Sequence, residues 1–290
     1  MPTRGKLALG LAGGCLAVLG VLWFAAFHVG FVERADDKVL LAFYNLTNLH
    51  YRHHIHAVAL VFVAPFDPAL FVFVAVLPVV VALARRRPYD AGAALVLLGG
   101  AGVTTLALKH LLPEPRADSF LGITSPVPYP RFPSGHSTAA MALVLALTLV
   151  APARVRPLIA TLGAVFAAAV GYSLLTLGSH FPTDVLAGFI VAAAWSLLTW
   201  WALPALDRGL SAVPMPGRPI SLREALAPLI AGFSAAAALA AIVVLTDPPS
   251  VVSYVRGHAA LIVGAFGIAA LSTTLSATVV LLSLRRDGPR

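Results

Sequence analysis

KHLLPEPR at 109–116, FPSGHS at 132–137 and SHFPTD at 179–184 are three short polar stretches in a chain otherwise dominated by Ala, Leu and Val. Each one stands at or near the end of a long apolar run. Polar residues gather at the ends of membrane spans, where helices leave the hydrocarbon. Whether the three stretches can form one site depends on the spans around them.

The composition is that of an integral membrane protein. Of the 290 residues, 59% are hydrophobic and 11% are charged, whereas soluble domains have about 25% charged residues. A net charge of +8 would suggest nucleic acid in a soluble protein. Here the basic residues lie mostly in short breaks between apolar runs, where they orient the spans. The composition therefore argues against nucleic-acid binding.

A transmembrane helix needs about 20 mainly apolar residues, because every backbone polar group must be satisfied inside hydrocarbon. Seven runs clearly meet or approach this length. An eighth candidate, 56–84, is interrupted by Phe66, Asp67 and Pro68, which can kink one helix or start a shorter one. Asp67 before Pro68 fits an N-cap and a first helical position. We expect an all-α, polytopic transmembrane bundle of about eight spans. The seven clear runs are 7–28, 91–111, 135–151, 156–177, 183–205, 226–246 and 259–283.

The basic residues predict the orientation of these spans. Most Lys and Arg residues lie at breaks of one parity, and positive loops stay inside. Both termini are therefore expected in the cytoplasm of a plasma-membrane protein, with all three polar stretches at the outer face. The residues at these breaks are Arg4, Lys6, Arg85, Arg86, Arg87, Arg154, Arg156, Arg208, Arg218, Arg223, Arg285, Arg286 and Arg290.

Residues 29–55 form an outer segment that can be a helix along the membrane surface. Its predicted apolar contacts are Phe31, Leu40, Leu41, Phe43 and Tyr44. The adjoining HYRHHIH, 50–56, resembles one histidine box of the membrane di-iron desaturases, which need several boxes. Metal binding by His50, His53, His54 and His56 stays an alternative to histidines that contact lipid head groups.

The residue types in the three stretches suit phosphate chemistry. Lys109 and Arg116 provide cations, and the planar fork of Arg matches phosphate oxygens. Ser134 and Gly135 stand where a helix begins, so backbone amides and the positive helix end would add to phosphate binding. Taken singly, each of these residues fits an interface anchor or a helix cap better than a phosphate ligand. Jointly, they are more than anchoring requires.

The histidines add reactive groups. His180 and Asp184 are four residues apart, so a helical turn or a tight loop can bring the carboxylate to one imidazole nitrogen. The other nitrogen would then be free to attack. His136, from a different span, can protonate the departing oxygen.

Order and spacing together resemble the signature of the phosphatidic acid phosphatase type 2 family, the lipid phosphate phosphatases, which share their site with vanadium haloperoxidases. The resemblance implies a six-span core over 1–206 and leaves the rest of the chain outside it. From their composition, we expect a cytoplasmic linker over 207–225 and an extra transmembrane hairpin with a basic tail over 226–290, where a protein partner could bind. The matching residues are Lys109 and Arg116, then PSGH at 133–136, then Ser173, His180 and Asp184.

The resemblance also implies roles. His180 would attack phosphorus to form a phosphohistidine, Asp184 would orient it, and His136 would be the acid, with no metal or other cofactor. The implied phosphate ligands are Lys109, Arg116, Ser134 and Gly135.

Two positions depart from the family pattern. Ala117 stands where the family has Pro, and Leu174 where it has an Arg that binds phosphate. A lost cation weakens transition-state binding in a dry site. We hypothesise that Arg131, two residues before Pro133, replaces it; a loop or head-group contact is the other interpretation.

Three functions follow as hypotheses. The first is an enzyme that removes or transfers phosphate on a polyprenyl phosphate or diphosphate, or on a glycerolipid phosphate. The second is a weakly active or inactive relative that binds or translocates such a lipid, as Leu174 suggests. The third, a metal-dependent oxidase, has too few ligands.

Overall fold

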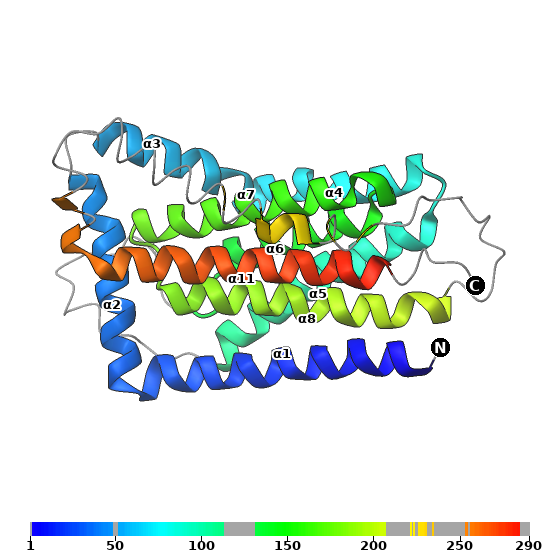
Figure 1. The fold of residues 1–290 in the computed structure, drawn as a ribbon, viewed down its shortest axis with the longest axis horizontal. Helices are drawn as coiled ribbons and strands as arrows, with labels where there is room; N and C mark the ends of the chain where they lie inside the picture. Colours follow the sequence, from blue (N-terminus) through cyan, green and yellow to red (C-terminus); the bar gives the residue numbers. More distant parts are fainter. Residues whose placement is uncertain are drawn as a thin grey trace.

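The structure, a computed structural model, describes residues 2–48, 52–112, 131–206 and 256–284, with a few positions between 221 and 254. Within these residues it is helical and has no strand, as the apolar runs predicted (Figure 1). The α-helices are α1 (Pro2–His28), α2 (Gly30–Tyr44), α3 (Arg52–Val63), α4 (Pro68–Ala84), α5 (Pro88–Leu111), α6 (Gly135–Val150), α7 (Arg156–Thr176), α8 (Pro182–Leu206) and α11 (Ala259–Leu284). Short 3-10 turns lie at Asn45–Asn48, Ala64–Phe66 and Ala153–Val155.

Five helical segments are long and apolar enough to cross a membrane: Lys6–His28, Pro88–Leu111, Ala153–Thr176, Pro182–Ala202 and Ala259–Leu282. The apolar helix α6 is shorter, with 16 residues. The expected polytopic helical bundle is thus confirmed as a fold class. The predicted span at 226–246 and most of the predicted linker at 207–225 lie largely outside the described residues.

The interrupted run at 56–84 is two helices rather than one. Its halves, His54–Phe66 and Pro68–Ala84, meet at a bend of 66°. Asp67 accepts a hydrogen bond from the backbone of Ala69 at 3.0 Å and so caps α4. The interpretation of Asp67 as an N-cap is confirmed.

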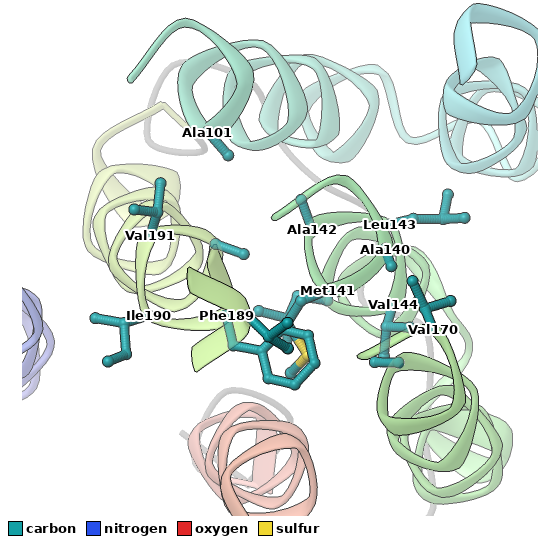
Figure 2. Close-up of a cluster of buried hydrophobic side chains, with 14 of the residues drawn as sticks. Ala101, Ala140, Met141, Ala142, Leu143, Val144, Val170, Phe189, Ile190 and Val191 are labelled. Carbon is teal, nitrogen blue, oxygen red and sulfur yellow. The ribbon is translucent and has the colours of Figure 1, made fainter. Parts of the chain in front are cut away.

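Helix α6 lies at the centre of the bundle. Met141, Leu145 and Leu149 on α6 are fully buried, and the helix packs against α5, α7 and α8. Figure 2 shows Met141 and Val144 of α6 between Phe189 of α8 and Val170 of α7. Helix α6 is therefore enclosed by protein over most of its length.

Two arginines donate hydrogen bonds to carbonyls at the C-terminal end of α6. Arg85, at the end of α4, donates a hydrogen bond to the carbonyl of Val150. The Nε atom of Arg156 donates to the carbonyl of Ala151 at 3.2 Å. Cations at the C-terminal end of a helix interact favourably with its dipole. The turns that carry Arg85 and Arg156 therefore lie at the end of α6 opposite Ser134.

Helix α2 lies across the other end of the bundle (Figure 1). Within the segment 29–55, which was predicted to form a surface helix, the structure has this helix over Gly30–Tyr44. Of its five predicted apolar contacts, Leu40 and Phe43 are buried, whereas Phe31 is 74% exposed. Asp36 is on the buried face of the same helix. This position is unusual for a carboxylate, because Asp is rarely buried unless it is paired.

Candidate active site

Two of the three polar stretches are bonded to each other. The backbone N–H of Ser134 donates to the carbonyl of Asp184 at 3.0 Å, and the hydroxyl of Ser137 donates to the carbonyl of Val185 at 3.2 Å. Ser134 also caps α6, because its Oγ accepts from the N–H of Ser137 at 3.3 Å. The starts of α6 and α8 therefore lie side by side, although the bonded residues Ser134 and Asp184 are 50 positions apart in the chain.

A glycine allows this close approach. Gly188 is in the second turn of α8, and a Cβ placed there would lie 2.8 Å from the carbonyl oxygen of Ser134. Real Cβ atoms essentially never come so near a backbone oxygen. The two helix starts can touch because position 188 has no side chain.

Replacing Gly188 by Ala is expected to push α8 away from α6 and to destabilise the protein. Overpacking of this kind costs about 1–3 kcal/mol, which thermal unfolding in detergent would detect as a lower Tm. Gly102→Ala, on α5, is the matched control, because nothing lies within 4 Å of a Cβ there. Equal Tm values for the two variants would show that the helices do not meet at Gly188.

His180 and Asp184 form the second element of the site. The Nδ1 atom of His180 lies 3.4 Å from the Oδ2 atom of Asp184, and the same oxygen accepts the N–H of Phe181 at 2.9 Å. Both residues are nearly enclosed, with 3% and 1% of their surfaces exposed. The carboxylate faces Nδ1, so Nε2 is the nitrogen that can react.

Lys109 and His136 complete a group of four residues that come from the end of α5, the start of α6, and the first turn of α8 with the residues before it. His136 is close enough to His180 and Lys109 for their charges to interact, and Lys109 interacts in the same way with Asp184. Lys109 and His136 are each half-buried. The ends of α5, α6 and α8 thus bring together two imidazoles, a cation and a carboxylate.

Asp67 also lies within electrostatic range of His136. It belongs to the break between α3 and α4, which therefore approaches the same end of α6. The sequence indicated only a capping role for this carboxylate, because nothing in its local pattern relates it to residue 136.

The remaining predicted residues differ in their placement. Arg116 lies outside the described residues. Arg131 is half-buried and Gly135 is the first residue of α6. Leu174 is 1% exposed, and its carbonyl accepts both the N–H and the hydroxyl of Ser179 at 3.0 Å. Position 174 thus shapes the turn before His180 through its backbone, while its side chain packs in the apolar core.

The structure adds two residues, Asp36 and Thr183, that the sequence analysis did not include in the site. The N–H of Thr183 donates to Oδ1 of Asp36 at 3.3 Å, and the Thr183 hydroxyl donates to Oδ2. Asp36 stands three and four residues before Val39 and Leu40, and so on their apolar face of α2. This spacing was a signal in the sequence that a carboxylate had a buried partner.

His54 and His56 are the histidines of 50–56 whose side chains the structure describes, and they form no metal centre with other described side chains. His54 and His56 are exposed on α3, and His50 lies outside the residues that the structure places. Within those residues, no group of three or more His, Cys, Asp or Glu side chains could hold a metal ion.

Residues 90–208 match the model of the PAP2 superfamily. Over these residues the chain is similar to the PAP2 superfamily. The match begins at the start of α5, ends just after α8, and contains all three polar stretches. It confirms the resemblance seen in the sequence. No curated protein matches the chain.

The PAP2 fold also relates the chain to a solved structure. The crystal structure of a transmembrane PAP2 type phosphatidylglycerolphosphate phosphatase from Bacillus subtilis is similar, with a TM-score of 0.54 and 22% identity. The likeness covers 69% of this chain and 97% of that one. At this identity it supports the helical PAP2 fold and leaves substrate and activity to be inferred from the site.

Proposed function

We propose that this protein is a membrane phosphatase or phosphotransferase that removes phosphate from a lipid phosphate or diphosphate. The observation that carries the proposal is the hydrogen bond from Ser134 to Asp184. It joins the start of α6, which carries the proposed acid His136, to the first turn of α8, which follows the proposed nucleophile His180.

The proposed reaction has two steps. In the first, Nε2 of His180 forms a bond to phosphorus while the bond from phosphorus to the lipid oxygen breaks, and His136 gives that oxygen a proton. In the second, His136 takes a proton from water, which attacks phosphorus, breaks the phosphorus–nitrogen bond and releases phosphate. Asp184 holds the tautomer of His180 in both steps.

Phosphate binding would fall to cations and to the first turn of α6. Lys109 and Arg116 supply charge, and Arg can bind two phosphate oxygens at once. The N–H of Ser134 is already bonded to Asp184, so Ser134 would contribute its hydroxyl, and the backbone donors would be those of Gly135 and His136. The positive end of the helix adds to this binding.

The proposed location is the outer face of a plasma membrane, with both termini in the cytoplasm. Support comes from the positions of Arg85 and Arg156, which lie at the end of α6 opposite the site. Basic residues favour the cytoplasmic side. The lipid chain would then lie among the spans while its phosphate enters at the outer ends of α5, α6 and α8.

Arg131 is proposed to supply the charge that Leu174 does not. We expect Arg131→Ala to lower phosphate release about a hundredfold to a thousandfold, as loss of a donor at a developing charge does. Arg131→Lys should recover part of the rate, because the charge is retained without the planar fork. Wild-type release by Arg131→Ala, measured beside an inactive Arg116→Ala, would remove Arg131 from the site.

The function itself is tested with purified protein and a panel of lipid phosphates in the presence of a chelator. The panel contains polyprenyl phosphate and diphosphate, phosphatidylglycerophosphate, phosphatidate and a polyprenyl-linked sugar phosphate. Release of phosphate that survives the chelator supports the proposal. Complete dependence on added metal would contradict the histidine mechanism.

A second candidate is a protein that binds or translocates a lipid phosphate without cleaving it. The buried, apolar Leu174 favours this function, because the side chain gives no charge to the transition state. Binding of lipid phosphate without release from any member of the panel would support it.

A further inference from the structure

Helix α8 lacks part of its own N-terminal cap. Phe181 precedes Pro182, the first residue of the helix, and a Phe side chain cannot accept hydrogen bonds from the free amides of the first turn. Asp184, the third helical residue, accepts the N–H of Phe181 at 2.9 Å. This is one half of a capping box. The N–H of Asp184 donates to the carbonyl of Phe181 at 3.1 Å, but position 181 has no side-chain acceptor for the N–H of Thr183.

Asp36 provides that acceptor from another helix. Its Oδ1 lies 3.3 Å from the N–H of Thr183, its Oδ2 accepts the Thr183 hydroxyl, and only 5% of the residue is exposed. A carboxylate at a helix N-terminus is favoured by the helix dipole. A buried carboxylate must also keep its hydrogen bonds, because the charge is costly to bury without them.

We infer that Asp36 is a positioning residue of the active site, a cap for α8 supplied by α2. Thr183 stands between His180 and Asp184, so a carboxylate that holds its N–H and its hydroxyl holds the turn that carries both. The inference rests on the proposed function for its catalytic consequence. The cap itself rests on the two hydrogen bonds alone.

Helix α2 is held in place by the C-terminal part of the chain. Gly264 of α11 faces Val39 and Phe43, and a Cβ there would meet the Phe43 ring at 3.5 Å. Tyr254 donates a hydrogen bond to the carbonyl of Ala42 at 2.8 Å. These residues lie outside the PAP2 match, which ends at residue 208.

Helix α7 completes the support. The ring of Phe43 stacks on that of Tyr172 with centroids 5.7 Å apart, and the Tyr172 hydroxyl donates to the carbonyl of Ala265 at 2.7 Å. The C-terminal helix thus supports α2, and α2 supports the turn of His180. This gives α11 a part in the site without any contact to substrate.

The test compares Asp36→Asn and Thr183→Val with Glu33→Gln as the matched control. Glu33 is on the same helix, one turn earlier, and its replacement removes the same charge. We expect Asp36→Asn to lower kcat about tenfold to a hundredfold, as small misplacement of reacting groups does, with KM changed by less than about twofold. A double variant that carries both Asp36→Asn and Thr183→Val should be no slower than Asp36→Asn alone, because the two residues act through one contact.

Hydrogen exchange gives a second measurement that does not depend on turnover. In Asp36→Asn, the amides of Phe181, Thr183 and Asp184 should exchange faster than in the wild type, while the rest of α8 stays protected. If Asp36→Asn does not fold, the same two measurements on Thr183→Val test the inference, because this variant removes the hydrogen bond of the Thr183 hydroxyl and no charge.

Three results would overturn the inference: an unchanged kcat in Asp36→Asn, an equal loss in Glu33→Gln, or unchanged exchange at 181–184. A wild-type protein that released no phosphate would instead defeat the proposed function. The exchange measurement would then still show whether Asp36 caps α8.

Discussion

Replacing His180 by Ala is expected to lower phosphate release by at least about a thousandfold, because removal of a nucleophile leaves only the contributions of binding and charge. The effect should be on kcat, since the cations that bind phosphate are unchanged. His56→Ala is the matched control: its side chain is exposed on α3, and its removal should leave the rate at the wild-type value.

A labelled substrate tests the nucleophile directly. Rapid quenching of the wild type with a lipid carrying radioactive phosphate should leave label on the protein in a bond that is stable to base and labile to acid, as expected of phosphohistidine. The label should be absent from His180→Ala and present in His56→Ala. Labelled His180→Ala protein would mean that another residue is the nucleophile.

Replacing His136 by Gln is expected to slow release from a lipid phosphate about a hundredfold to ten-thousandfold, the usual contribution of a positioned acid. The loss should depend on the leaving group. A substrate such as p-nitrophenyl phosphate, whose phenolate departs without a proton, should be hydrolysed by the variant at a rate much closer to that of the wild type.

Lys109→Ala is the comparison for His136→Gln. A cation that binds phosphate contributes whatever group departs, so Lys109→Ala should slow both substrates alike. If His136→Gln also slowed both substrates to the same degree, His136 would be a phosphate ligand and another group would be the acid. The pattern across two substrates thus distinguishes the two roles.

Local features of the site could be predicted from the sequence. The Ser134 cap and the spacing of His180 and Asp184 involve residues within one helical turn, where sequence separation determines distance. Asp67 followed by Pro68 predicted the cap of α4 for the same reason. The apolar runs predicted the helices, because hydrocarbon admits few other backbone structures.

Contacts between distant segments could not be predicted in this way. The bonds between Asp36 and Thr183 join residues 147 positions apart, and only the packing of α2 across the bundle brings them together. The use of the Ser134 amide by Asp184 depends on the close approach at Gly188. Helical periodicity indicates which face is buried, but it does not identify the partner.

The support of α2 by α11 has a consequence for biosynthesis. A ribosome completes residues 1–208, with every residue of the PAP2 match, before it makes Gly264 or Ala265. The contacts of α11 with Val39 and Tyr172 can therefore form only when α11 has entered the membrane and docked against helices made much earlier. A nascent chain would therefore hold His180 in an incompletely supported turn until α11 has been made and has docked, so α11 would set the time at which this turn matures.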